Sequence, residues 1–296
     1  MAFNRRQFLK TGFATTATLA LATPEAMAGF DVPRKRARHK ACREPFFFIQ
    51  YSDPQFGFID DKGGTTTAEE ELMDKVVNII NQLRPPFVIA TGDYVHHLLN
   101  ENEMQLYKKY VAMIDPSVKV LHVPGNHDIN SLDPKYLTFY ESNISADHFY
   151  YEYEGCAFIG LNSTWICNPG SKQEAEQWQW LCEKLEEAQR CRFIFVVAHI
   201  PFLITEFDED DNYSNIPQSQ RYRYFVLFEQ YGVNAVFCGH LHKPATAQHS
   251  GIDYFTCGST GKQLGGFPGM NLIQVFPDYY TVAYKALDTF PRRLFL

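Results

Sequence analysis

Five clusters of polar side chains follow short apolar runs along this 296-residue chain. They contain Asp, Asn, Gln and His residues, which offer oxygen and nitrogen atoms to a cation. The candidate metal ligands are Asp53, Gln55, Asp93, Asn126, His199, His240 and His242. Such a mixed set suits hard and borderline divalent metals and lacks the thiolates that a soft metal prefers. Seven donors exceed the needs of one tetrahedral ion, so the set indicates two ions that share a carboxylate.

Each cluster comes directly after an apolar run that is typical of a buried strand. The five runs cover residues 46–50, 87–90, 119–123, 193–197 and 234–238. Because the carboxyl ends of the strands in an open α/β sheet border one crevice, residues far apart in the sequence can meet there. A single Gly-Asp or His-x-His would be ordinary turn chemistry, whereas five clusters in this order predict a common metal-binding cleft.

The remaining segments predict one mixed α/β domain, which we place at residues 46–296. Apolar residues at helical spacing predict helices at residues 68–83, 173–189 and 220–231. Further strands are expected at residues 149–161 and around Tyr254, Ile273 and Val282. No internal repeat, low-complexity segment or linker-like change of composition follows residue 45, so a second domain is not indicated.

The composition excludes several classes of protein. Hydrophobic residues make up 45% of the chain, charged residues 21% and aromatic residues 15%, which argues against a disordered, collagen-like or coiled-coil protein. No stretch reaches the roughly 18 unbroken apolar residues of a membrane span, so stable membrane insertion is not expected. The formal net charge of −7 disfavours a nucleic-acid-binding role.

Residues 1–28 resemble a twin-arginine export signal. The paired Arg5 and Arg6 precede a short apolar run, and a small-x-small cleavage site ends at Ala28. The resemblance implies the twin-arginine export machinery as a partner and a periplasmic or extracellular location; the alternative is an ordinary basic amphipathic helix. The basic segment at residues 29–45 is expected to be a solvated leader rather than a contact to anionic lipid.

Seven cysteines are present, an odd number that does not suggest a disulfide framework in a chain of this length. None of them forms a Cys-x-x-Cys pair, so thiolate zinc sites and thioredoxin-like chemistry have no support. We expect most of the cysteines to be small core residues.

The order of the clusters resembles the signature of the calcineurin-like metallophosphoesterases, which reads Asp-x-His, Gly-Asp, Gly-Asn-His-Asp or Glu, His, and Gly-His-x-His. The matching segments begin here at Asp53, Gly92, Gly125, His199 and Gly239, and the resemblance covers residues 46–276. It implies a four-layer αββα sandwich, in which two mixed sheets are flanked by helices.

Within that family the chain is most similar to the branch typified by calcineurin-like phosphoesterase domain-containing protein 1, whose members are described as protein serine/threonine phosphatases. The similarity lies in residues 53–57, 92–96, 208–211 and 263–265. The purple acid phosphatases are less similar, because they need a Tyr ligand where this chain has His96.

The resemblance implies a dinuclear centre that hydrolyses a phosphate ester, with a monoester favoured, through attack by a hydroxide that bridges the metals. In that pattern Asp53, Gln55 and His242 hold the first metal. Asn126, His199 and His240 hold the second. Asp93 bridges the two ions, which we expect to be manganese, iron or zinc.

The resemblance also assigns residues around the metals. His127 is expected to protonate the leaving group or to stabilise the charge of the phosphoryl group. Asp128 either orients the His127 imidazole or stabilises the turn. The expected substrate contacts are Asn126, His127 and His96; His96 and His97 are otherwise expected at the rim of the site or in packing, not as ligands.

Gln55 departs from the family pattern, in which most members have His. Because a Gln carbonyl oxygen is a harder and weaker donor than imidazole, the first site is expected to bind metal less tightly. It should favour manganese, iron(II) or magnesium over zinc.

Two other functions stay open at this point. A phosphodiesterase that acts on nucleotides or lipid head groups would use the same metals with a different rim. A non-catalytic scaffold of the same fold is less favoured, because the motif residues are all present. The acidic segment at residues 206–211 is interpreted as a solvated loop, or as a rim that repels polyanions or receives a basic substrate.

Overall fold

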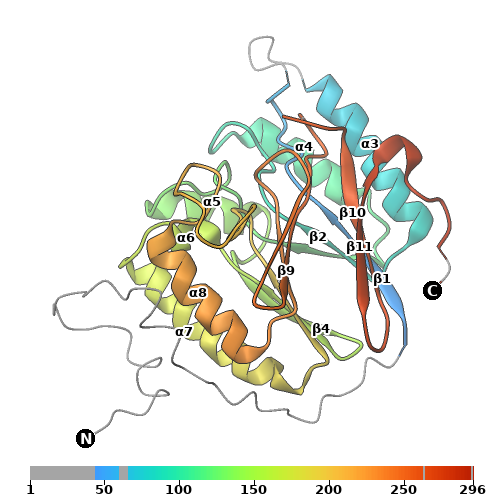
Figure 1. The fold of residues 1–296 in the computed structure, drawn as a ribbon. Coiled ribbons are helices and arrows are strands. Elements are labelled where there is room, and N and C mark those ends of the chain that lie inside the picture. The colour runs from blue at the N-terminus through green and yellow to red at the C-terminus, as the bar shows by residue number, and fades with distance from the viewer. Residues whose placement is uncertain (1–43, 60–65, 263, 295) are drawn as a thin grey trace, which may run out of the picture.

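The computed structural model describes residues 44–59, 66–262, 264–294 and 296 (Figure 1). The predicted export signal at residues 1–28 lies outside the described residues, as does nearly all of the basic leader at residues 29–45. Within the described part, no helix is both long and apolar enough to cross a bilayer.

The first sheet contains the strands that precede the first three clusters. Its order is β11-β10-β1-β2-β3, in which β1, β2 and β3 run parallel and β10 pairs antiparallel with β1. The strands are β1 (Phe46–Tyr51), β2 (Phe87–Ala90), β3 (Lys119–His122), β10 (Gly269–Val275) and β11 (Tyr280–Ala286). The helices α3 (Thr67–Leu83) and α4 (Glu101–Ala112) cover its outer face (Figure 1).

The second sheet contains the strands that precede the last two clusters. Its order is β4-β5-β6-β7-β9-β8, with β5, β6, β7 and β9 parallel. The strands are β4 (Phe149–Tyr153), β5 (Cys156–Gly160), β6 (Phe193–Val197), β7 (Ala235–Cys238), β8 (Ala245–His249) and β9 (Ile252–Thr256). The helices α7 (Lys172–Glu187) and α8 (Gln218–Tyr231) pack on its outer face (Figure 1).

An aromatic layer joins the two sheets. Successive side chains of a strand point to opposite faces, so β1 directs Phe46 and Phe48 toward the other sheet and Ile49 toward the helices. The Phe48 ring lies 5.2 Å from Phe158 and 5.8 Å from Phe237, both on the second sheet. Three apolar layers between four structural layers confirm the predicted αββα sandwich.

Several elements were not expected from the sequence. They are α4, β8, α5 (Pro134–Asn143), α6 (Ser163–Ile166) and two short 3-10 helices at Ala188–Arg190 and Leu287–Thr289. The predicted strand at residues 149–161 is an antiparallel hairpin of β4 and β5. The five predicted strands before the clusters are present, each within a residue of its expected bounds. Their carboxyl ends therefore carry the candidate ligands, as expected.

Candidate metal centre

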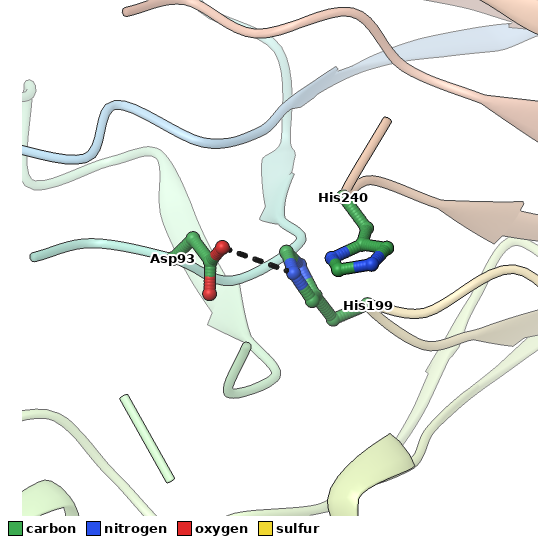
Figure 2. Close-up of side chains that lie close together, drawn as sticks. All are labelled: Asp93, His199 and His240. Carbon is green, nitrogen blue, oxygen red and sulfur yellow. Dashed lines mark ion pairs between the residues drawn. The ribbon is translucent and has the colours of Figure 1, made fainter. Parts of the chain in front are cut away.

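The structure brings the acidic and imidazole ligands into two overlapping groups. One group contains Asp93, His199 and His240, and the other contains Asp53, Asp93 and His242; all are buried, and the candidate ligand atoms of each group lie within 4.8 Å of one another. Asp93, which belongs to both groups, is the residue that the family pattern assigns as the bridge. Figure 2 shows Asp93 and His199 facing each other beside His240.

Three buried polar atoms at this site form no hydrogen bond: Gln55 Oε1, Asn126 Oδ1 and His199 Nε2, the last of which lies 3.2 Å from the Asp93 carboxylate. Buried polar atoms are nearly always paired, since an unpaired one costs about 1–3 kcal/mol. All three can donate an electron pair to a cation, and all three belong to predicted ligands. The donor set therefore fits bound metal ions: the five acidic and imidazole ligands converge, and Gln55 and Asn126 each add an oxygen that forms no hydrogen bond.

The imidazoles are oriented by main-chain carbonyl groups. His199 Nδ1 donates to Thr91 O at 2.6 Å, His242 Nδ1 to Lys262 O at 2.5 Å, and His240 Nε2 to Tyr213 O at 3.0 Å. Because a carbonyl only accepts, each of these ring nitrogens carries a proton, and the other nitrogen of each ring is the one available to a cation. Such carbonyl partners commonly fix the tautomer of metal-binding histidines.

The backbone is strained at most of the candidate ligands. Asp53, Gln55, Asp93, His240 and His242 adopt positive φ angles between 42° and 73°. Such conformations are uncommon for residues other than Gly, and they persist only where the surrounding structure enforces them. Five of the nine non-glycine residues with positive φ in the described chain are thus predicted ligands, which marks the centre as a functional site.

Glycines before the ligands permit the close approach of the ligand loops. A Cβ on Gly92, where φ is 88°, would collide with the backbone of Gly125 and with the His199 ring. A Cβ on Gly125 would collide with the Asp93 carboxylate. The Gly-Asp and Gly-Asn-His-Asp motifs therefore need glycine because the ligand loops touch at these points.

Neighbouring charges shift the pKa values of Asp93 and His199 in opposite directions. Burial raises the pKa of Asp93, but the His199 imidazole, 3.2 Å away, outweighs it and holds this pKa below its usual range. For His199, burial lowers the pKa, and the carboxylates of Asp93 and Asp53 outweigh burial and raise it to about 9. The carboxylates thus stabilise a positive charge at this point, and a bound cation would take the place of that proton.

The Asp128 carboxylate stabilises the turn and does not contact the donor nitrogen of the His127 ring, which is held by His96 O. Its carboxylate accepts hydrogen bonds from the backbone N–H groups of Asp93, Tyr94 and Gly125 at 2.8–3.0 Å. The Nδ1 atom of His127 donates to His96 O, so its imidazole is oriented by that carbonyl. These contacts correspond to the turn-stabilising alternative for Asp128 and contradict the alternative in which it orients His127.

The His96 ring forms one wall beside the centre. It stacks on Phe58 at 4.5 Å and on His127 at 5.2 Å. His97 points instead to Glu103, whose carboxylate accepts a hydrogen bond from His97 Nδ1 at 2.6 Å. His96 is therefore at the rim of the site beside His127, whereas the exposed His97 is paired with Glu103.

The acidic segment is partly structural. The Glu209 carboxylate is paired with Arg221, whose side chain is 0% exposed. It also accepts hydrogen bonds from the backbone of Ile204 and Thr205 and from the Asn215 side chain. Glu209 is therefore neither a solvated loop residue nor a free rim charge, while Asp208 remains exposed.

Sequence reasoning missed three residues that orient ligands: Thr91, Lys262 and Tyr213. Each acts through its main-chain carbonyl, which every residue type has, so no side-chain pattern could have identified them. The cysteines agree with the expectation of core positions: among the described residues, four of six are buried.

Comparison with known proteins places these features in a family. Residues 48–244 match the calcineurin-like phosphoesterase family. The serine/threonine-protein phosphatase CPPED1 of Homo sapiens is 31% identical over 265 residues, which cover 82% of this chain and 84% of the human protein. A probable glycerophosphodiester phosphodiesterase GpdQ of Arcobacter nitrofigilis is 28% identical over 223 residues, 73% of this chain and 79% of that protein.

A solved structure supports the fold. The dimetal phosphatase of Danio rerio superposes with a TM-score of 0.59 at 15% sequence identity, over 82% of this chain and 96% of that one. At 15% identity, this similarity supports a shared fold and nothing further.

Proposed function

The chain belongs to the calcineurin-like phosphoesterases, a family of phosphoric ester hydrolases, and from this we propose that it hydrolyses phosphate monoesters at a centre of two divalent metal ions. The observation that carries the proposal is the position of Asp93 in both groups of candidate ligands. A carboxylate shared in this way can hold two ions side by side.

The residues divide between two ions. Asp53, Gln55 and His242 would hold the first ion, and Asn126, His199 and His240 the second. When bound, two divalent ions would acidify a water molecule and neutralise charge on the phosphoryl oxygens. The oxygen and nitrogen donors suit manganese, iron or zinc. No serine or cysteine nucleophile is required.

His127 would act on the substrate. Its backbone N–H donates to Asp93 Oδ1 at 2.8 Å, which ties the residue to the centre of the site. Because Nδ1 donates to His96 O at 2.6 Å, Nε2 carries a proton only in the imidazolium form. In that form Nε2 can donate to a leaving-group oxygen or to a phosphoryl oxygen, which are the two roles proposed for it.

Charge favours a monoester. Two divalent ions beside the ionised Asp53 and Asp93 give the centre a charge of about +2, which attracts a phosphate dianion more strongly than a diester monoanion. Lys262, whose ammonium lies 4.5 Å from the Phe58 ring, adds a further positive charge near His242, whose ring is 5.5 Å from that of Phe58. The similarity to a named protein phosphatase points the same way.

The similarity to a probable glycerophosphodiester phosphodiesterase favours a second candidate, hydrolysis of diesters. The two are separated by assaying p-nitrophenyl phosphate and bis(p-nitrophenyl) phosphate after the protein is loaded with manganese, iron or zinc. We expect a higher kcat/KM for the monoester. A higher value for the diester would replace our proposal, and turnover of neither ester by metal-loaded protein would indicate a non-catalytic scaffold.

We also propose that residues 1–28 direct export by the twin-arginine machinery to the periplasm or the extracellular space. The paired Arg5 and Arg6 support it. Replacing both arginines by lysine should keep the protein in the cytoplasm with an uncleaved N-terminus, as detected by fractionation and N-terminal mass spectrometry. Continued export of this variant would refute the proposal.

A further inference from the structure

Tyr213 contacts two of the candidate ligands of the second metal. Its main-chain oxygen accepts a hydrogen bond from His240 Nε2 at 3.0 Å, and its phenol oxygen accepts one from Asn126 Nδ2 at 2.9 Å. Its ring lies 4.9 Å from the His240 ring. The side chain is nevertheless 74% exposed, so burial in a core does not explain why it is held there.

The phenol contact stabilises the orientation of the Asn126 amide in which Nδ2 faces Tyr213. The two ends of an Asn amide are almost equal in shape, but only the oxygen can donate an electron pair to a cation. Because the phenol oxygen accepts from Nδ2, the amide oxygen is left as the buried, unpaired Oδ1 atom. Without the phenol, the observed orientation would lose this hydrogen bond, and the amide could rotate and present its NH2 group to the metal.

The segment around Tyr213 is held firmly on both sides. Asn212 donates its backbone N–H to Asn215 Oδ1, and Ser214 donates its backbone N–H to Asn212 Oδ1 at 2.7 Å. The Asn215 side chain in turn donates to Glu209, the partner of the fully buried Arg221. The turn that carries Tyr213 is therefore anchored to a buried charge pair, which limits its freedom to leave the site.

We propose that Tyr213 is a positioning residue for the second metal: its phenol fixes the Asn126 amide, and its carbonyl fixes the His240 tautomer, in the forms that bind the ion. This inference rests on the proposed dinuclear function. Partners that orient metal ligands typically change metal affinity by about 10–100-fold when they are removed. The carbonyl survives any substitution of the side chain, so a side-chain variant tests the phenol contact alone.

The direct test is manganese binding to metal-stripped full-length protein, measured by isothermal titration calorimetry. Tyr213→Phe keeps the ring and removes the phenol oxygen. We expect one of the two classes of Mn²⁺ sites to weaken by about tenfold or more, while the other class is unchanged. The control is Tyr279→Phe, a change at an exposed tyrosine stacked on Phe276 in the turn between β10 and β11. Unchanged binding in Tyr213→Phe, or equal weakening of both classes, would overturn the inference.

A second variant separates orientation of the amide from a general structural role. In Asn126→Asp the two carboxylate oxygens are equivalent, so no partner is needed to choose between them. In this background, Tyr213→Phe should weaken Mn²⁺ binding by less than about threefold. An undiminished loss would show that Tyr213 does not act through the amide. If the wild-type protein binds none of Mn²⁺, Fe²⁺ and Zn²⁺, the dinuclear proposal itself fails.

Discussion

The two sheets supply chemically different halves of the metal centre. Loops after β1, β2 and β3 of the first sheet carry the oxygen half, which consists of Asp53, Gln55, Asp93 and Asn126. Loops after β6 and β7 of the second sheet carry the imidazole half, which consists of His199, His240 and His242. Each group of buried donors draws on both halves, so neither sheet builds the site on its own.

The halves are also positioned by different means. In the oxygen half, Asp128 ties the Asp93 and Gly125 loops together through backbone N–H groups. In the imidazole half, each ring is held by a carbonyl, and the carbonyl for His199 comes from Thr91, at the end of β2 in the other sheet. Donor chemistry thus follows the sheet, and one of the orienting contacts, from Thr91 to His199, also ties the two sheets together.

Asp93→Asn tests whether one residue joins the halves, and it should have the largest effect. The substitution keeps an oxygen that can accept from His127 N–H but removes the charge placed 3.2 Å from His199. We expect kcat/KM for p-nitrophenyl phosphate to fall by about 10³-fold or more, with loss of bound metal, because charge stabilisation by metals contributes several kcal/mol. Asp288→Asn, at an exposed ion pair with Lys75, serves as the control. Full activity in Asp93→Asn would show that the Asp93 charge is not needed to join the two halves.

Arg221→Met tests how the imidazole half is supported. Arg221 lies on α8 behind the second sheet, and its removal leaves Glu209 buried without its cation. Breaking a buried pair in this way costs about 3–5 kcal/mol in the free energy of unfolding, measured by urea denaturation. Arg190→Met, at a pair whose arginine is 49% exposed, should cost at most about 1 kcal/mol. Equal losses for the two variants would contradict a structural role for the Glu209 pair.

The oxygen half could largely be predicted from the sequence, because its donors directly follow apolar strands. β1, β2 and β3 end where the hydrophobic runs end, and the Gly-Asp and Gly-Asn-His-Asp motifs follow at once. The helix α4 was missed, although Asn100 accepts from the N–H groups of Asn102 and Glu103 and thereby caps it. An Asn followed three residues later by Glu is a readable helix start.

The support of the imidazole half could not be predicted from the sequence. Sequence patterns report side-chain type, whereas Lys262 and Tyr213 act through carbonyl groups brought near by tertiary folding. The acidic segment shows the same limit. Composition suggests a solvated run of carboxylates, but Glu209 becomes structural because Arg221 on a later helix reaches it. Such long-range pairs depend on the packing of elements and leave no local signal.

His122→Leu tests whether a buried histidine of the first sheet makes stability depend more strongly on pH than a half-buried histidine of the second sheet does. His122 ends β3 against the Tyr94 and Tyr107 rings, and burial lowers its pKa to about 3. The unfolded chain binds this proton below about pH 6.5 while the folded chain does not, so stability falls as the pH decreases. Between pH 6.5 and 5.0 the metal-stripped wild type should lose about 1.5–2 kcal/mol more than the variant.

The measurement is urea denaturation of both proteins at the two pH values. His249→Leu is the matched variant in the second sheet, where burial lowers the pKa of a histidine that is only half-buried at the end of β8. It should change the pH dependence less than His122→Leu does. A parallel loss of stability in the wild type and His122→Leu would show that His122 is protonated in the folded state.

Gln55→His places an imidazole in the oxygen half and should have the smallest effect. Histidine tolerates the positive φ of 42° at this position better than most residues, so the backbone can remain in place. Because imidazole is the stronger donor for borderline metals, affinity at the first site should rise by about tenfold, with a shift in preference from manganese toward zinc. Elemental analysis after dialysis, with both metals in competition, measures the two changes. Gln248→His adds an imidazole on β8, outside the candidate ligand set, and should leave metal retention unchanged. If Gln55→His also retains no more metal than the wild type, the Gln55 oxygen is not a ligand, and the oxygen half consists of Asp53, Asp93 and Asn126 alone.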